Sequence, residues 1–146
     1  MQIVNEQTDQ GVTERDVTLE VDGEQVPGTL WLPEGADVPR TFVLLGHGGL
    51  QSRRAPNIVG LARQLVTNQG YGVAALDAPG HGDRSPDAAA VEATRQKLAA
   101  GEGQLDADQT RQLFGRIARH GDEWRALLDA LDAAGLSDGQ VGYWGV

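Results

Sequence analysis

TFVLLGHGGL, residues 41–50, is the stretch around which the rest of the chain is organised. Residues 42–45 are all apolar and end at Gly46, which is typical of a short strand buried on both faces inside a parallel sheet. The glycine-rich loop that follows has little side-chain bulk and lies at the carboxyl end of the strand, where open α/β sheets bind ligands. Glycines there leave amide N–H groups free to donate. The stretch therefore predicts a backbone-lined site for a negatively charged or polarised oxygen.

The segments before this strand predict an antiparallel hairpin at one edge of the sheet. Residues 16–21 (DVTLEV) alternate apolar and polar side chains, and Asp22-Gly23 after them is a strong turn signal. The alternation resumes over residues 26–32, which completes the hairpin. Residues 1–14 are polar and mixed, and we expect them to form a loose lead-in.

The segment after the glycine loop predicts a strand, a helix and a second strand. Apolar residues recur at helical spacing over about 57–69, Pro56 suits the first turn of a helix, and Gly70 suits its end. Residues 71–77 (YGVAALD) predict a second buried strand, parallel to the first. A second glycine-rich loop, residues 78–85 (APGHGDRS), follows at the same end of the sheet.

The last part of the chain predicts two helices and a third strand. Residues 87–100 favour a helix, and Asp106 or Asp108 suits the cap of a longer one that reaches about Ala134. The longer helix carries one apolar face, formed by Phe114, Ile117, Trp124, Leu127, Leu128 and Leu131. Residues 140–146 (QVGYWGV) predict a third buried strand, parallel to the strands at residues 41–45 and 72–77. The pattern predicts an α/β fold with a mostly parallel central sheet and helices on both faces.

The composition narrows the classes of function. The 146 residues suffice for one domain, and the net charge of −9 argues against nucleic acid or an anionic membrane surface as a partner. The lack of cysteine excludes disulfides, thiolate metal sites and cysteine nucleophiles within this chain. No apolar run approaches the length of a membrane span, and the N-terminal sequence has no secretory pattern, so we expect a cytoplasmic location.

No cofactor and no metal are predicted. His47, Asp77, His81 and Asp83 could converge at the carboxyl edge of the sheet, but their spacing matches no known metal motif. A Rossmann-like nucleotide-binding module is an alternative reading, because a glycine loop follows the first strand and an aspartate ends the next. Against it, the glycine fingerprint fails at Gln51, and Asp77 lies further along the chain than that fingerprint expects.

The motifs together resemble those of the α/β-hydrolase family, over about residues 15–146. The resemblance rests on the hairpin and on three strand ends, His47-Gly48-Gly49, Asp77-x-x-Gly80-His81-Gly82-x-x-Ser85 and Gly142-Tyr143-Trp144-Gly145-Val146. In that family the last of these strands runs into the nucleophile elbow, Gly-x-Ser-x-Gly. The resemblance implies that residues 1–146 are the N-terminal part of a single hydrolase domain and that a serine nucleophile directly follows Val146.

The resemblance also implies which residues act. The backbone amides of Gly49 and Leu50 would supply part of an oxyanion hole. The loops would be supported by His47, Gly48, Asp77 and His81. The implied activity is that of a serine hydrolase, which cleaves a small-molecule carboxylic ester or related acyl bond through an acyl-enzyme. The catalytic acid and histidine would lie further along the chain, and the remainder of the same domain would be the partner. A non-catalytic relative with the same fold is a second alternative.

Three charged residues beside the loops are expected to have structural or solvated roles. We expect the Asp77 carboxylate to accept hydrogen bonds from amides of residues 78–82. Arg53 and Arg54 follow the first glycine loop near the start of a surface helix, and we expect both side chains to lie in solvent.

Overall fold

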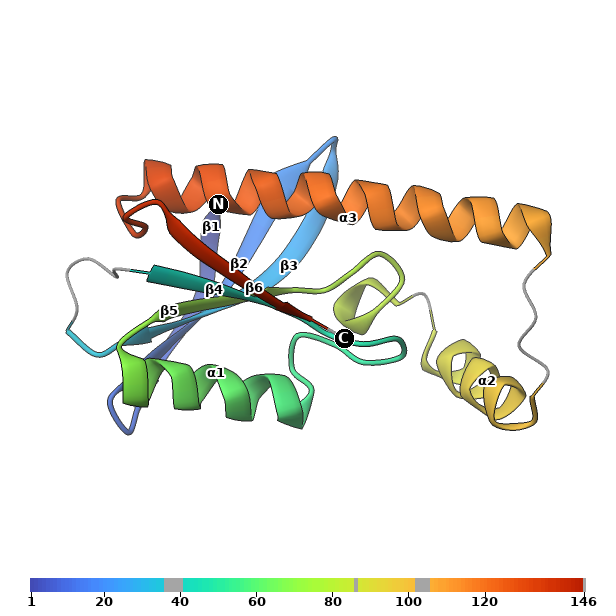
Figure 1. Ribbon diagram of the computed structural model, residues 1–146, viewed down its shortest axis with the longest axis horizontal. Helices are drawn as coiled ribbons and strands as arrows, with labels where there is room; N and C mark the ends of the chain where they lie inside the picture. Colours follow the sequence, from blue (N-terminus) through green and yellow to red (C-terminus); the bar gives the residue numbers. More distant parts are fainter. Residues whose placement is uncertain (36–40, 86, 102–105, 146) are drawn as a thin grey trace.

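The computed structural model describes residues 1–35, 41–85, 87–101 and 106–145, and its strands form one mixed sheet between two layers of helix (Figure 1). The strand order is β1-β2-β3-β5-β4-β6. The strands are Gln2–Asp9 (β1), Val12–Val21 (β2), Glu24–Pro33 (β3), Thr41–Gly46 (β4), Gly72–Leu76 (β5) and Gln140–Gly145 (β6). The helices are Pro56–Gln69 (α1), Ala88–Ala99 (α2) and Ala107–Ala133 (α3), with a short 3-10 turn at Gly82–Arg84 (η1). None of these described helices is both long enough and apolar enough to cross a lipid bilayer.

The three strands predicted from apolar runs pair as parallel neighbours, but β6 is exposed at five of its six residues and not buried as expected, because no described strand or helix covers it. β4 lies between β5 and β6 and is parallel to both. The hairpin of β2 and β3 is also confirmed, and β3 joins it to β5 in antiparallel orientation. Because the described strands also include the antiparallel pair β1 and β2, antiparallel pairings outnumber parallel ones there, and a mostly parallel sheet is not confirmed.

The loose lead-in expected over residues 1–14 is wrong. β1 pairs with β2 along nearly its whole length. A turn at Gln10 and Gly11 connects the two strands, and both residues have a positive φ, 51° and 76°. All eight residues of β1 are exposed, so its side chains carry no alternation that marks a strand. Backbone pairing holds this strand, helped by ion pairs from Arg15 to Glu6 and from Arg63 to Asp9.

Each face of the sheet buries its own apolar cluster under one helix. Leu30 and Leu32 of β3 point to the face covered by α3, while Trp31 between them points to the face covered by α1. α1 begins at Pro56 and ends at Gly70, whose φ of 68° lies in the left-handed region. Its buried residues, Ile58, Ala62 and Val66, recur at helical spacing. The strand alternation and the helix period thus agree on the same two-faced core.

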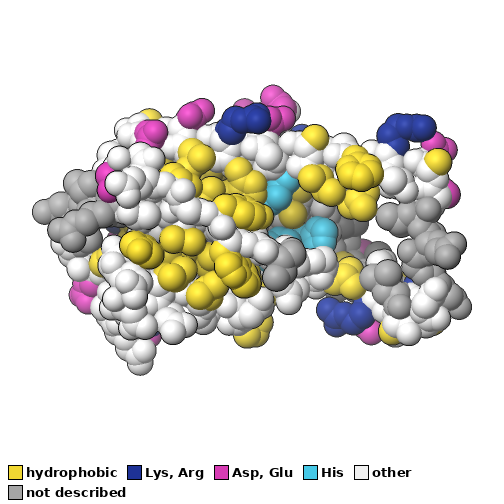
Figure 2. All heavy atoms as spheres, viewed as in Figure 1, with side chains coloured by type: hydrophobic (Ala, Val, Ile, Leu, Met, Phe, Trp, Pro, Cys, Tyr) yellow, Lys and Arg dark blue, Asp and Glu magenta, His cyan; other side chains and the backbone are white. Residues whose placement is uncertain are grey.

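The long helix α3 packs against the sheet only through its C-terminal half. Its N-terminus is capped at Asp106 by a reciprocal pair of hydrogen bonds with Gln109. Leu127 and Leu131 are fully buried, whereas Phe114 and Ile117, on the predicted apolar face, are 64% and 56% exposed. Figure 1 shows why, since the N-terminal half of α3 extends past the carboxyl ends of the strands. Apolar side chains therefore remain on the surface there and along β6 (Figure 2).

Candidate functional site

The loop after β4 forms a tight turn over residues 48–51. The Gln51 N–H donates to the Gly48 carbonyl at 3.2 Å, and the Gly48 N–H donates to the Gln51 side-chain oxygen at 3.2 Å. Leu50 has a φ of 61°, a left-handed backbone conformation that residues other than glycine rarely adopt. A positive φ at the third residue of a hydrogen-bonded turn is the mark of a type II turn.

Two amides of this turn are unused. Among the described residues, neither the Gly49 nor the Leu50 N–H donates a hydrogen bond. A Cβ placed on Gly49 would meet no atom within 4 Å, so open space lies beside this amide. The turn thus presents two consecutive N–H donors, unpaired among the described residues, at the carboxyl edge of the sheet.

His47 joins this loop to the one after β5. Its Nε2 accepts a hydrogen bond from the Ala78 N–H at 3.1 Å, and its Nδ1 lies 3.0 Å from the Gly48 carbonyl. Both contacts are satisfied when Nδ1 carries the proton and the ring is neutral. Burial lowers the pKa of His47, which favours that neutral form. The His81 ring lies beside it, with ring centroids 5.3 Å apart.

Arg53 is buried against Asp77, contrary to the expectation that it lies in solvent. Its guanidinium pairs with the Asp77 and Asp83 carboxylates, and its backbone N–H donates to Asp77 at 2.8 Å. Asp77 is fully buried and also accepts from the Asp83 N–H at 2.9 Å. Its donors are therefore the amides of Arg53 and Asp83, and not those of residues 78–82. The contacts between Arg53 and Asp77 therefore hold the loop after β4 against the loop after β5.

Gly82 is required for that arrangement. A Cβ at this position would lie 2.3 Å from the Asp77 carboxylate, and its φ of 53° is in the left-handed region. No larger residue fits without moving the carboxylate that holds both loops.

Arg54 makes a second tie, from the first loop to β2. Its guanidinium pairs with the carboxylates of Glu14 and Asp16 while 37% of the side chain stays exposed, so Arg54 is solvated as expected but also paired. Burial opposes its charge, but the hydrogen bonds with these two carboxylates outweigh burial and raise the pKa of Arg54.

Arg84 ties the second loop to α3. It donates to the Asp77 carbonyl at 3.1 Å and to the buried Glu123 carboxylate at 2.9 Å. His120 lies 2.8 Å from the same carboxylate. Burial works to raise the pKa of Glu123, but His120 and Arg84 lower it, so this carboxylate stays ionised.

β6 brings a third strand end to the site. It pairs with β4 in register up to the Gly46–Gly145 pair, so both strands end side by side. The Tyr143 hydroxyl lies so close to Gly46 that a Cβ there would meet it at 2.1 Å. Val146, the last residue of the predicted strand, lies outside the described residues. Among the described strands, β6 has no partner on its other side.

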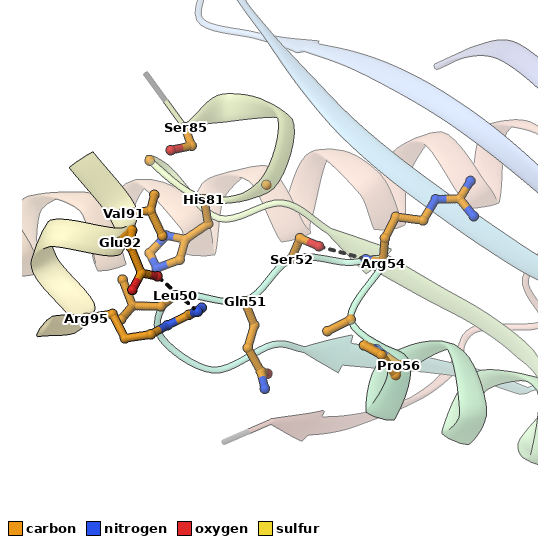
Figure 3. Close-up of a pocket in the computed structure, with 13 residues that line it drawn as sticks. Leu50, Gln51, Ser52, Arg54, Pro56, His81, Ser85, Val91, Glu92 and Arg95 are labelled. Carbon is orange, nitrogen blue, oxygen red and sulfur yellow. Dashed lines mark hydrogen bonds and ion pairs between the residues drawn. The ribbon is translucent and has the colours of Figure 1, made fainter. Parts of the chain in front are cut away.

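A cleft of about 760 Å³ opens beside the first loop (Figure 3). Leu50, His81 and Ser85 line it from the two loops, and Val91 and Arg95 line it from α2. A smaller cleft of about 440 Å³ shares several of these walls and continues to Arg116 on α3. Within the described part of the chain, no three histidine or acidic side chains gather closely enough to hold a metal ion.

The sequence reasoning missed the cleft residues on the helices. Ser85 was part of the quoted loop motif but received no role, and Val91 and Arg116 carried no local signal. These residues line the cleft because α2 and α3 lie beside the loops. Residue spacing within either helix does not predict where the helix lies relative to the loops.

Comparison with known proteins gives structural neighbours only. No protein-family model matches the chain, and no curated protein matches it. A PEG-bound cold-adapted esterase from an Arctic intertidal metagenomic library is 32% identical, with a TM-score of 0.72 over 99% of this chain and 55% of its own. A native structure under the same description is 28% identical, with a TM-score of 0.59 over 99% of this chain and 53% of its own.

A Klebsiella pneumoniae protein named as a dienelactone hydrolase shares the fold at 15% identity and a TM-score of 0.61, over 92% of this chain and 49% of its own. The chain thus spans about half the length of these neighbours. Its α/β fold, with a mixed sheet between helices, is the fold found in these esterases and hydrolases.

Proposed function

We propose that this chain is the N-terminal part of an α/β-hydrolase domain that cleaves a small-molecule carboxylic ester or related acyl bond. The observation that carries the proposal is the pair of unpaired amides at Gly49 and Leu50, held at the carboxyl edge of the sheet. The esterases among the structural neighbours support the same class of reaction.

The two amides suit an oxyanion hole. Acyl transfer builds negative charge on the carbonyl oxygen, and donors held about 2.7–3.1 Å from that oxygen stabilise it without rearranging. The turn over residues 48–51 fixes the direction of both N–H groups, while His47, Asp77 and His81 support the two loops around it. Gly48 adds no side chain that would block the approach of a substrate.

The nucleophile is proposed to be a serine directly after Val146. Because Gly145 pairs with Gly46, a chain that continues along β6 would pass next to His47 and Gly48. A sharp turn from strand to helix at that point would place a serine hydroxyl beside the free amides. The amide of the residue after the serine would give a further donor.

The proposed reaction has two steps. The serine oxygen attacks the ester carbonyl while a histidine further along the chain takes its proton, and the alcohol leaves with that proton. An acyl-enzyme results. Water then attacks the acyl group while the same histidine takes one of its protons, the histidine passes that proton to the serine oxygen, and the carboxylic acid is released. In both steps the oxyanion forms next to the Gly49 and Leu50 amides.

The test compares Gly49→Pro and Leu50→Gly in the protein that contains the complete domain. Proline suits the second position of a type II turn, so Gly49→Pro removes one N–H and keeps the turn. We expect it to lower kcat about 10²–10³-fold with little change in KM if the Gly49 amide binds the oxyanion. Leu50→Gly keeps both amides and relieves the positive φ, so it should lose far less kcat than Gly49→Pro, although it removes a side chain that lines the cleft.

Replacing the Leu50 amide by an ester, with leucic acid at that position, tests the second donor in the same way. A domain in which neither the proline nor the ester variant loses turnover does not use this turn as its oxyanion hole. A folded domain with no ester hydrolysis at all supports the non-catalytic alternative.

A further inference from the structure

We propose that the smaller cleft is a substrate subsite for a carboxylate, so that the preferred ester carries a second, anionic group read by Arg116 and Ser85. The inference rests on the proposed ester hydrolysis and deepens it by naming the substrate class.

The cleft lies next to the proposed oxyanion donors. Leu50 lines it from the turn, and Gly80, His81 and Ser85 line it from the second loop. Val91 and Leu113 add apolar wall from α2 and α3. Its volume of about 440 Å³ is in the size range of small-molecule pockets, which begins at about 300 Å³. A substrate with its carbonyl at the turn can therefore extend one arm into this cleft.

Arg116 is the arginine of this cleft that has no acidic partner among the residues that the structure describes. Among the described residues, the other arginines of these two clefts pair with carboxylates, Arg54 with Glu14 and Asp16, and Arg95 with Glu92. Arg84 and Arg119, which line a neighbouring cleft together with Arg116, both pair with Glu24. Arg116 makes no ion pair with any described residue. Its Nη1 would lie 3.7 Å from a Cβ on Gly80, so the guanidinium reaches the second loop.

An unpaired guanidinium is notable in this chain because acidic residues outnumber basic ones by 21 to 12. Carboxylates are abundant, yet no described one reaches Arg116. The planar fork of a guanidinium matches a carboxylate with two parallel hydrogen bonds.

Ser85 brings a hydroxyl to this cleft from the second loop. Its hydroxyl oxygen is buried and has no hydrogen-bond partner among the described residues. A buried hydroxyl without a partner costs about 1–3 kcal/mol, so a ligand oxygen that accepts from it is favoured. Ser85 and Arg116 line the same cleft, and both donate to an anion.

The experiment uses two esters of equal chain length, p-nitrophenyl hexanoate and p-nitrophenyl hydrogen adipate, with the protein that contains the complete domain. We expect a higher kcat/KM for the adipate ester, and a roughly fivefold loss of the adipate-to-hexanoate ratio in Arg116→Gln. Arg111→Gln is the matched control, because Arg111 lies on the same helix, pairs with Asp108 in solvent and lines neither cleft. Its ratio should equal that of the parent.

A second readout needs no turnover. Titration with adipate, followed by the amide resonances of Leu50 and Ser85, should show about fivefold weaker binding in Arg116→Gln than in Arg111→Gln. Equal binding and equal ester ratios in the two variants would overturn the carboxylate subsite while leaving ester hydrolysis in place. Adipate binding at Arg116 without hydrolysis of either ester would keep the subsite and refute the proposed function.

Discussion

The two edges of the sheet are built in opposite ways. β1 forms one edge with eight exposed residues, and most of them are polar, including Glu6 and Asp9. β6 forms the other edge, has no charged residue, and exposes Val141, Tyr143 and Trp144 by 42%, 64% and 41%. Polar and charged side chains protect an open edge from pairing with other chains, whereas an apolar edge invites it.

The difference shows which edge of the sheet is stable in water as it stands and which edge needs a cover. Polar and charged side chains protect the β1 edge. At the β6 edge, apolar side chains stay exposed, and so do those of the α3 residues Leu113, Phe114 and Ile117. The candidate site lies at the carboxyl end of β4, next to this uncovered edge. If the chain is the N-terminal part of a longer hydrolase domain, as proposed, the following segment should cover β6 and bring the nucleophile with it.

The largest predicted effect comes from shortening one side chain of β6, that of Trp144, in the complete domain. Trp144→Ala should lower the free energy of unfolding by about 3 kcal/mol, because a covered tryptophan loses its packing and leaves a cavity. Ile3→Ala on β1 should change it by less than about 0.5 kcal/mol, since Ile3 is 50% exposed at an edge that needs no cover. Urea unfolding of both variants measures the contrast. Equal, small losses would show that β6 also faces solvent in the complete domain.

Gly82→Ala tests the fixed loops at the carboxyl end of β4 and β5. The added Cβ clashes with the Asp77 carboxylate and has a strained φ, so we expect a loss of about 2 kcal/mol. Gly60→Ala is the control, because Gly60 lies within α1 with no atom near its Cβ, and alanine should stabilise the helix by about 0.5–1 kcal/mol. Thermal unfolding of both variants is the measurement. An unchanged Gly82→Ala protein would contradict the close contact with Asp77.

Acid should weaken the carboxyl-edge loops before it affects the β1 edge. Burial lowers the pKa of His47 below its usual 6.5, so the unfolded chain binds the proton first. This contribution to stability is complete above pH 6.5 and is lost as pH falls through the lowered pKa. Protonation also removes the acceptor for the Ala78 N–H. Hydrogen exchange at pH 7.5 and 5.5, with each rate divided by the intrinsic exchange rate at that pH, should show a lower protection factor at Ala78 in acid, and His47→Gln should remove that pH dependence.

The smallest effect concerns the ion pairs of the β1 edge. Glu6→Gln removes the partner of Arg15 at a solvent-exposed position, and such pairs contribute about 0–1 kcal/mol. Urea unfolding should therefore place the variant within that range, with a smaller difference at high salt. A loss above about 2 kcal/mol would mean that the β1 edge depends on charge pairing more than its exposure suggests.

The sequence predicted the central strands and missed the edge, for physical reasons. Apolar runs in β4 and β5 and the Asp22-Gly23 turn report burial and backbone geometry directly. β1 is exposed along its whole length and has no such pattern. The periodicity of α3 predicted an apolar face but not that its first half would find nothing to pack against.

The sequence predicted the backbone loop of the candidate site. It did not predict the ion pairs between charged side chains that hold this loop in place. The turn with Gly49 and Leu50 follows from a glycine-rich loop at a strand end. The Arg53–Asp77 pair joins residues 24 positions apart, and no local spacing signals a contact of that kind. Arg53 is 7% exposed because the fold brings two carboxylates to it.

The most direct test of the account is the structure of the complete domain after reaction with a serine-directed fluorophosphonate. The account predicts a phosphonyl adduct on a serine directly after Val146, with the phosphonyl oxygen about 2.7–3.1 Å from the Gly49 or Leu50 nitrogen. An adduct on another residue, an oxygen directed away from residues 47–50, or a domain that is folded and unlabelled would contradict it.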